Sequence, residues 1–117
     1  MRAESVALLE VLVTHHRATC RRSDRAAPPR ETCLITYGAL CQRAGVPNLT
    51  RVVGQSLLEV AQWCEERALP PINSLAVNAE TRMPGENYDV APNCSLLDWP
   101  ADADACIRCR DYPARAQ

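Results

Sequence analysis

Residues that start and stop helices lie close together near the middle of the chain, and this pattern constrains the fold more than any other feature. Thr36 can cap a short helix over residues 37–44 by accepting an amide hydrogen bond, and Gly45 suits the C′ position that ends it. Pro47 lacks a backbone donor and disfavours helical geometry in the residue before it. We therefore expect a two-turn helix followed by a tight turn over residues 46–49.

A second, longer helix is predicted over residues 50–67, because two consecutive prolines, Pro70 and Pro71, stop it soon afterwards. Its apolar side chains recur at the three- and four-residue spacing of one helix face. This face contains Val53, Leu57, Val60, Ala61 and Cys64. Two helices joined by a tight turn form a helix-turn-helix.

Extended segments are predicted on both sides of this pair of helices. Residues 33–35 are expected to form a short strand or extended entry. Apolar and polar residues alternate over residues 72–78, which suits a strand with one apolar face. Residues 81–88 can return as a second arm, and Pro84-Gly85 restricts the pairing to a short ladder or an edge. We expect a β-hairpin wing, so that the helix-turn-helix and its wing cover residues 36–88.

The remaining segments are predicted to complete a single domain over residues 1–117. Residues 4–20 have the periodicity of a helix with one apolar face. Residues 21–31 contain paired prolines and charge without an apolar period, which is typical of an exposed basic loop. Within the C-terminal segment 89–117, residues 101–110 are expected to form a short helix. The predicted fold class is mainly α with a small β-hairpin (α+β), a winged helix-turn-helix-like domain.

Charge is divided unevenly along the chain, although the net charge is only −1. Residues 1–60 contain eight Arg and five acidic residues, a balance of +3, whereas residues 61–117 contain five Arg and nine acidic residues, a balance of −4. A polyanion is therefore expected to meet the N-terminal half. The apolar run over residues 6–13 is far too short to cross a bilayer. We expect a cytoplasmic protein without a membrane partner.

The start of the second helix carries side chains that suit contact with DNA. In helix-turn-helix proteins this part of the second helix enters the major groove, where Arg, Asn and Gln hydrogen-bond to base edges. The predicted contacts here are Asn48, Thr50, Arg51 and Gln55. Phosphate contacts are predicted from the basic loop, through Arg21, Arg22 and Arg25. Acidic residues follow along the helix and repel phosphate, namely Glu59, Glu65 and Glu66.

Two short motifs resemble a known family. The sequence Thr36-Tyr37-Gly38-Ala39-Leu40-Cys41, followed by Asn-Leu-Thr-Arg-Val-Val-Gly over residues 48–54, is similar to the DNA-binding half of the O6-alkylguanine-DNA alkyltransferases and the alkyltransferase-like proteins. The resemblance implies that Tyr37 touches the phosphate of a rotated nucleotide and that Arg51 enters the base stack. The family's active thiol lies in a Pro-Cys-His-Arg sequence, whereas residues 71–75 here are Pro-Ile-Asn-Ser-Leu. Alkyl transfer is therefore not expected.

The seven cysteines fit no closed disulfide framework, because their number is odd. Cys106 and Cys109 form a C-x-x-C pair, and Cys94 with His15 or His16 offers further zinc ligands. Structural zinc sites normally use two such pairs, so we expect these thiols to pack against the core and we expect no metal or other cofactor. Adjacent helical side chains point about 100° apart, so one histidine is expected to be buried and the other exposed.

Two functions remain open from the sequence. The preferred one is a DNA-binding module of the winged helix type. We expect it to be non-enzymatic, because no cysteine is paired with a base and an orienting acid. The alternative is a small interaction or inhibitory protein of a phage or mobile element, acting on a protein partner through its acidic second half. For that alternative, Trp63, Trp99 and Glu65-Glu66 are expected to present the working surface.

Overall fold

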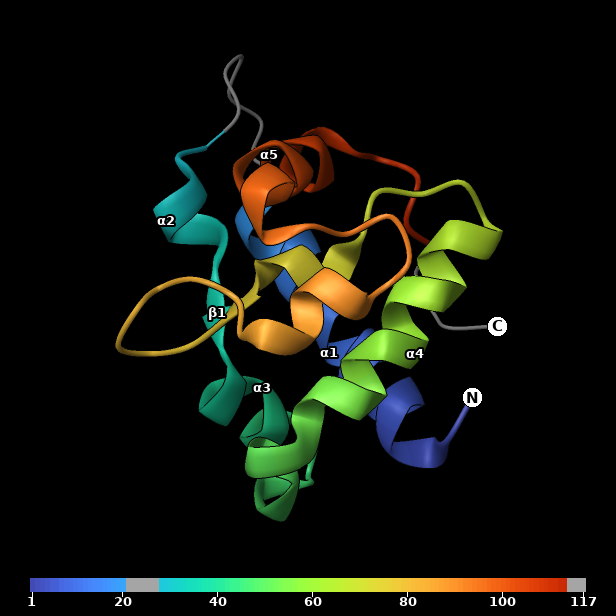
Figure 1. The fold of residues 1–117 in the computed structure, drawn as a ribbon, viewed down its shortest axis with the longest axis vertical. Coiled ribbons are helices and arrows are strands. Elements are labelled where there is room, and N and C mark those ends of the chain that lie inside the picture. The colour runs from blue at the N-terminus through green and yellow to red at the C-terminus, as the bar shows by residue number, and fades with distance from the viewer. Residues whose placement is uncertain (21–27, 114–117) are drawn as a thin grey trace.

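The computed structural model describes residues 1–20 and 28–113, which are mainly helical (Figure 1). The five α-helices of these residues are α1 (Ala3–Cys20), α2 (Arg30–Cys33), α3 (Tyr37–Arg43), α4 (Val53–Glu66) and α5 (Trp99–Arg108). Four 3₁₀ helices lie between them: η1 (Pro47–Val52), η2 (Ile72–Leu75), η3 (Glu86–Val90) and η4 (Leu96–Asp98). Two short strands, β1 (Ile35–Thr36) and β2 (Ala76–Val77), complete the fold.

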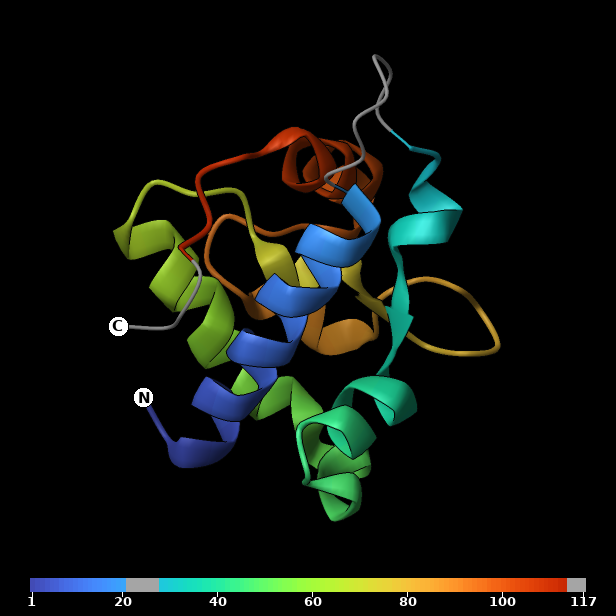
Figure 2. The same ribbon diagram turned by 180° about the vertical axis from the view of Figure 1, so that it is seen from behind.

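Helix α1 lies across one side of the molecule, and Figure 2 shows it from that side. Its inward face consists of aliphatic side chains that are almost wholly buried against α4, η2 and α5, namely Leu8, Leu9, Leu12 and Val13. The expected N-terminal helix over residues 4–20 is therefore confirmed. Because α1 contacts elements from the whole length of the chain, it is the scaffold on which the other helices are placed.

Helix α3 begins and ends as its capping residues predict. The Thr36 hydroxyl oxygen accepts a hydrogen bond from the Ala39 amide at 3.2 Å. Gly45 has a φ of 77°, in the left-handed region that favours glycine, and ends the helical geometry. The expected helix over residues 37–44 is therefore confirmed to within one residue. The preceding segment differs from the prediction, since the expected strand 33–35 ends a short helix, α2, and begins β1.

The predicted long helix over residues 50–67 is divided into two parts, and this corrects the sequence-based prediction. Pro47 occupies the first turn of the 3₁₀ helix η1, and the Thr50 hydroxyl donates to the Pro47 carbonyl at 2.9 Å. Regular α geometry begins only at Val53, after Val52 departs from it with a φ of −119° and a ψ of 16°. The side chains predicted to lead the recognition helix therefore lie mainly on η1 and only partly on α4.

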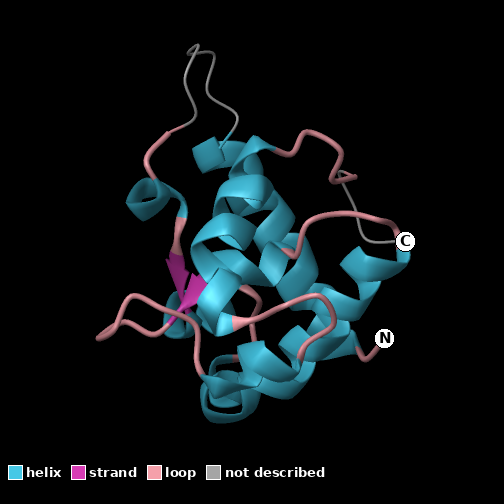
Figure 3. Ribbon diagram, turned by 45° about the horizontal axis from the view of Figure 1, so that its top comes forward, coloured by secondary structure: helices cyan, strands magenta, loops and turns pink. Residues whose placement is uncertain are grey.

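The expected β-hairpin wing is not formed by the described residues, as the secondary structure in Figure 3 shows. Strand β2 pairs with β1 in parallel, with Ile35 opposite Ala76 and Thr36 opposite Val77. The returning arm over residues 81–88 instead forms a loop and part of η3. The coarser prediction, a mainly helical chain with a small β element, is confirmed.

Local hydrogen bonds explain why the segment after β2 turns into a loop. The Asn78 side-chain oxygen accepts from the amides of Glu80 and Thr81, at 2.8 and 3.4 Å. The Asn78 amide donates to the Met83 carbonyl at 2.9 Å, and Arg82 takes a left-handed φ of 57°. Asparagine side chains commonly stabilise turns in this way, in competition with a strand ladder. Pro84 then supplies no amide for pairing.

The C-terminal part packs over the core through long-range side-chain contacts. Helix α5 begins at Trp99, two residues before the predicted start, with Pro100 in its first turn, where a missing amide costs little. The Trp99 indole nitrogen donates to the Ser74 carbonyl at 2.8 Å. The Tyr112 hydroxyl donates to the Pro70 carbonyl, and its ring meets the His16 ring edge to face. In the part of the chain that the structure describes, no helix has both the length and the apolar character needed to cross a membrane.

Candidate nucleic-acid interface

A hollow of about 370 Å³ lies where η1 and the start of α4 meet the loop after β2. Three of the predicted DNA contacts line it, namely Tyr37, Thr50 and Arg51. The opposite wall consists of residues for which the sequence suggested no role: Asn78, Gly85, Glu86 and Asn87. The structure therefore brings part of the predicted site together with a segment that was expected to be a strand.

The Tyr37 hydroxyl is fixed on this hollow by the backbone of the facing loop. The Gly85 amide donates to the Tyr37 oxygen at 2.7 Å. Burial raises the pKa of Tyr37 above its ordinary value of 10.0, so the hydroxyl is protonated near neutral pH. Since its oxygen already accepts a hydrogen bond, the hydroxyl hydrogen is suited to donate to an acceptor such as a phosphate oxygen.

The close approach of the two walls depends on a glycine in the first turn of α4. A Cβ atom at Gly54 would lie 1.7 Å from Asn87 Nδ2 and 2.9 Å from Asn87 Cβ, far inside van der Waals contact. Any other residue at position 54 would displace Asn87 or widen the hollow. The missing side chain of Gly54 therefore permits α4 and η3 to pack closely.

The remaining predicted contacts are arranged less compactly. Asn48 and Gln55 are exposed and are close in sequence to Thr50 and Gly54, but neither lines the hollow. Arg51 is exposed as well as lining the hollow, so its guanidinium is accessible. The predicted phosphate contacts of the basic loop, Arg21, Arg22 and Arg25, lie outside the described residues.

Acidic groups limit where a polyanion can bind. Glu86 lines the same hollow as Arg51 and opposes an anion there. Glu59, on α4, accepts from the Ser5 hydroxyl at 2.5 Å and pairs with Arg2 at 3.3 Å. These hydrogen bonds lower the pKa of Glu59, Ser5 contributing most, so this carboxylate fixes α4 to α1. Glu86 on the facing wall and Glu59 further along α4 would therefore each oppose a polyanion.

The two adjacent histidines of α1 are both buried, which corrects the expectation that one would be exposed. His15 Nε2 donates to the Cys33 carbonyl at 2.9 Å, and His16 Nε2 lies 2.8 Å from the Cys106 carbonyl. Burial, followed by the charge of Arg43, lowers the pKa of His15 below its ordinary value of 6.5. The two side chains diverge as expected, but segments of the chain cover both directions.

The thiols pack within the protein. Cys106 is fully buried, and Cys109 packs against the core while remaining partly exposed, as does Cys94 against its own cluster. Burial raises the pKa of both Cys20 and Cys64 to about 12, so these thiols are poor nucleophiles at neutral pH. Among residues 1–20 and 28–113 no three His, Cys, Asp or Glu side chains are grouped to hold a metal ion.

The tryptophans predicted to present an interaction surface are instead buried. Trp63 and Trp99 are each 5% exposed. The Arg67 guanidinium lies 4.4 Å from the Trp63 ring centre, and that of Arg30 lies 5.4 Å from the Trp99 ring centre. Their periodic spacing with other apolar residues of α4 and α5 is the sequence signal that could have placed them in the core.

Comparison of the chain with protein-family models, with curated proteins and with solved structures finds no match. The candidate site therefore depends on the geometry described above.

Proposed function

We propose that the protein binds DNA without catalysing a reaction, through the surface formed by α3, η1 and the first turn of α4. In this proposal α3 and α4 are the two helices of a helix-turn-helix, η1 is its extended turn, and the loop over residues 78–85 occupies the place of a wing. The observation that carries the proposal is the convergence of Tyr37, Thr50 and Arg51 on one hollow.

The charge of this surface supports the same function. Residues 32–58 contain two arginines, Arg43 and Arg51, and no acidic residue. The chain carries a slight net negative charge, most of its acids lying after residue 60, so an approaching polyanion would favour this acid-free segment over the acidic second half. Arg51 would supply the charge, whereas the Tyr37 hydroxyl would donate a hydrogen bond that fixes the position of a phosphate.

Each exposed side chain of the surface has a distinct task in this proposal. Arg51 enters a groove and hydrogen-bonds to an acceptor on a base edge, for which guanine is the preferred partner of arginine. Asn48 and Gln55 extend the contact on either side. Glu86 repels phosphate within the hollow, so it would restrict the DNA backbone to the part of the hollow that lies away from this carboxylate.

The test is fluorescence anisotropy of a labelled DNA duplex titrated with the full-length protein at low and moderate salt. Binding is expected to weaken as salt rises, because phosphate contacts release counterions. Arg51→Ala is expected to cost about 1–3 kcal/mol of binding free energy if Arg51 contacts a base.

Arg108→Ala is the matched control, because it removes the same charge from an exposed position on α5. It is expected to change the affinity much less than Arg51→Ala. Equal losses in both variants, or no binding by the unmodified protein at low salt, would show that the α3–η1–α4 surface is not a DNA-binding site.

A further inference from the structure

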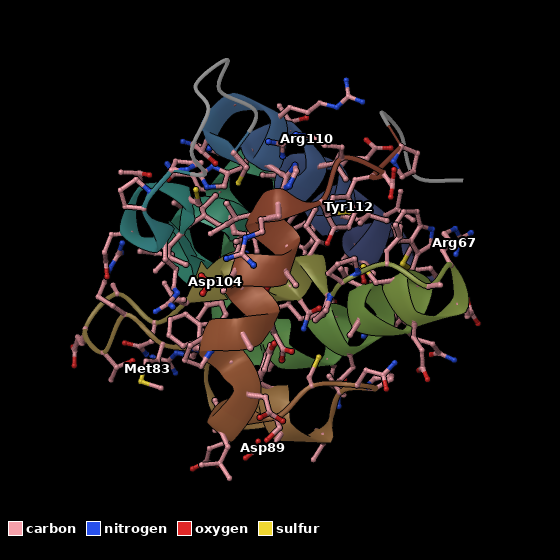
Figure 4. All side chains as sticks on the ribbon, turned by 90° about the horizontal axis from the view of Figure 1, so that it is seen from above. Arg67, Met83, Asp89, Asp104, Arg110 and Tyr112 are labelled. Carbon is pink, nitrogen blue, oxygen red and sulfur yellow. The ribbon has the colours of Figure 1, made fainter. Side chains whose placement is uncertain are left out.

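The C-terminal part of the chain has a second surface of opposite charge. Residues 83–107 contain five acidic residues and no Arg, Lys or His. Two of these acids have side-chain partners: the Tyr88 hydroxyl donates to Asp102 at 2.6 Å, and Arg30 pairs with Asp104 at 3.3 Å. In Figure 4, Asp89 lies at the lower edge of the molecule, well away from the labelled arginines.

A hydrogen bond from a backbone amide to a carboxylate joins two segments that each carry an exposed apolar side chain. Asp89 Oδ1 accepts from the Leu96 amide at 2.5 Å, so that residues 89–90 lie beside residues 96–97. Leu97 is 93% exposed and Val90 is 69% exposed, the two highest values among the large hydrophobic side chains of the described residues. We define the Leu97 patch as Asp89, Val90, Leu97 and Asp98.

The exposed side chain of Leu97 does not contribute to the buried core. Leu96, next to Leu97, packs against the buried cluster around Tyr88 and Trp99. Leu97 itself contacts solvent over nearly its whole surface, although burying a leucine would contribute about 1.5–3 kcal/mol. Within residues 1–20 and 28–113, neither Asp89 nor Asp98 has an ion-pair partner within 4.0 Å. The patch therefore offers apolar contact and unneutralised negative charge at one place.

We propose that the Leu97 patch is a docking surface for a protein segment that presents an apolar side chain between arginines or lysines. The apolar side chain would cover Leu97 and Val90, and the cationic groups would pair with Asp89 and Asp98. Charge complementarity excludes nucleic acid and anionic lipid as occupants, because the carboxylates repel both. The patch is separate from the proposed DNA-binding surface, and neither proposal requires the other.

The test uses the full-length protein and two synthetic peptides of identical composition. One peptide forms an amphipathic helix with leucines along one face and arginines on both sides of them, and the other has the same residues in scrambled order. Binding is measured by isothermal titration calorimetry at two salt concentrations. The amphipathic peptide is expected to bind more tightly than the scrambled one, because only the former places apolar and cationic groups together.

Two pairs of variants separate the apolar from the electrostatic contribution. Leu97→Ala is expected to weaken binding about tenfold, as the loss of buried apolar area requires, whereas Met83→Ala on the loop after β2 should change it less than about twofold. Asp98→Asn is expected to weaken binding and to reduce its salt dependence, whereas Glu80→Gln, an equal charge change on that same loop, should do neither.

Three results would overturn the proposal: no binding of the amphipathic peptide, equal binding of both peptides, or equal losses in the patch and control variants. Circular dichroism of each variant verifies folding, which Leu97→Ala should preserve because its side chain is exposed. Duplex binding by Leu97→Ala is measured in parallel and should be unchanged, so that failure of this proposal is distinguishable from failure of DNA binding.

Discussion

Residues 32–58 and residues 83–107 are segments of similar length that differ in both charge and construction. The first contains no acid and the second contains no base. The first consists largely of helices that are capped by neighbouring residues, such as Thr36 and Gly45. The second contains two 3₁₀ helices and α5, and its own Tyr88 and Trp99 side chains hold it in place through hydrogen bonds to Asp102 and to the Ser74 carbonyl. The comparison teaches that one charged surface is encoded locally, whereas the other depends on tertiary contacts.

The largest loss of stability is expected when the main tertiary contact of the acidic segment, residues 83–107, is removed. Trp99→Ala deletes a side chain that is 5% exposed, together with its hydrogen bond to the Ser74 carbonyl. We expect a loss of about 3–5 kcal/mol in the free energy of unfolding, measured by urea denaturation. Leu97→Ala, two residues away and 93% exposed, should change it by less than about 0.5 kcal/mol. Equal effects would mean that the acidic segment does not depend on Trp99.

A smaller effect is expected from a local change in the acid-free segment. Gly45→Ala places a Cβ atom at a φ of 77° and should cost about 1–2 kcal/mol of stability. Gly38→Ala is the matched control, because a Cβ atom there meets no atom within 4 Å and α3 should gain up to about 1 kcal/mol. Thermal unfolding of both variants should therefore give shifts of opposite sign. Shifts of the same sign would contradict the local encoding of α3.

The hydrogen bond between η3 and α5 gives a finer measure of the acidic segment. Tyr88→Phe retains the buried ring and removes the hydroxyl that donates to Asp102 at 2.6 Å. We expect a loss of about 1 kcal/mol, with faster hydrogen exchange in residues 83–107 than in residues 32–58. Equally faster hydrogen exchange in both segments would show that the acidic segment does not depend on this hydrogen bond more than the acid-free segment does.

The smallest expected effect is a dependence of the free energy of unfolding on pH, which comes from His15 on α1. The pKa of His15 is lowered in the folded protein, so the unfolded chain binds a proton more readily. The neutral, buried His15 therefore contributes its full stability above the ordinary pKa of 6.5. This contribution is lost as the pH falls below 6.5 towards the lower pKa of the folded protein. Urea midpoints at about pH 7.5 and about pH 5.5 test this.

His15→Gln is the control for the pH experiment. Glutamine retains an amide that can donate to the Cys33 carbonyl but does not titrate in this range. The variant should therefore lose less stability than the unmodified protein between the two pH values. An identical loss in both proteins would assign the pH dependence to another group.

The sequence predicted what local chemistry determines. The helical periodicity predicted α1, and Thr36 and Gly45 predicted the two ends of α3. The parallel pairing of β1 and β2 was missed because each strand has only two residues and its partner lies far along the chain. A pattern of alternating residues cannot distinguish such a pair from a hairpin.

Only one wall of the candidate site was predicted, because local sequence patterns do not reveal contacts with segments far along the chain. Tyr37 lies on α3, whose ends were predicted from local signals, and Thr50 and Arg51 follow Pro47 on η1, whereas the facing wall of Gly85 and Asn87 depends on a loop. That loop is shaped by Asn78, whose side chain hydrogen-bonds to its own backbone neighbours. The pair Pro84-Gly85 indicated an interruption in the strand, but nothing in the sequence indicated that the interruption contacts Tyr37.

The adjacent histidines of α1 couple the two regions. His15 contacts the carbonyl of Cys33, at the start of the acid-free segment, and His16 contacts that of Cys106, near the end of the acidic one. Since consecutive helical side chains diverge by about 100°, one helical turn fixes the angle between the two attachments. On the two proposals made above, a duplex and a cationic partner bound at the same time would be held in one relative orientation. The protein would then determine the geometry of an assembly in addition to its composition.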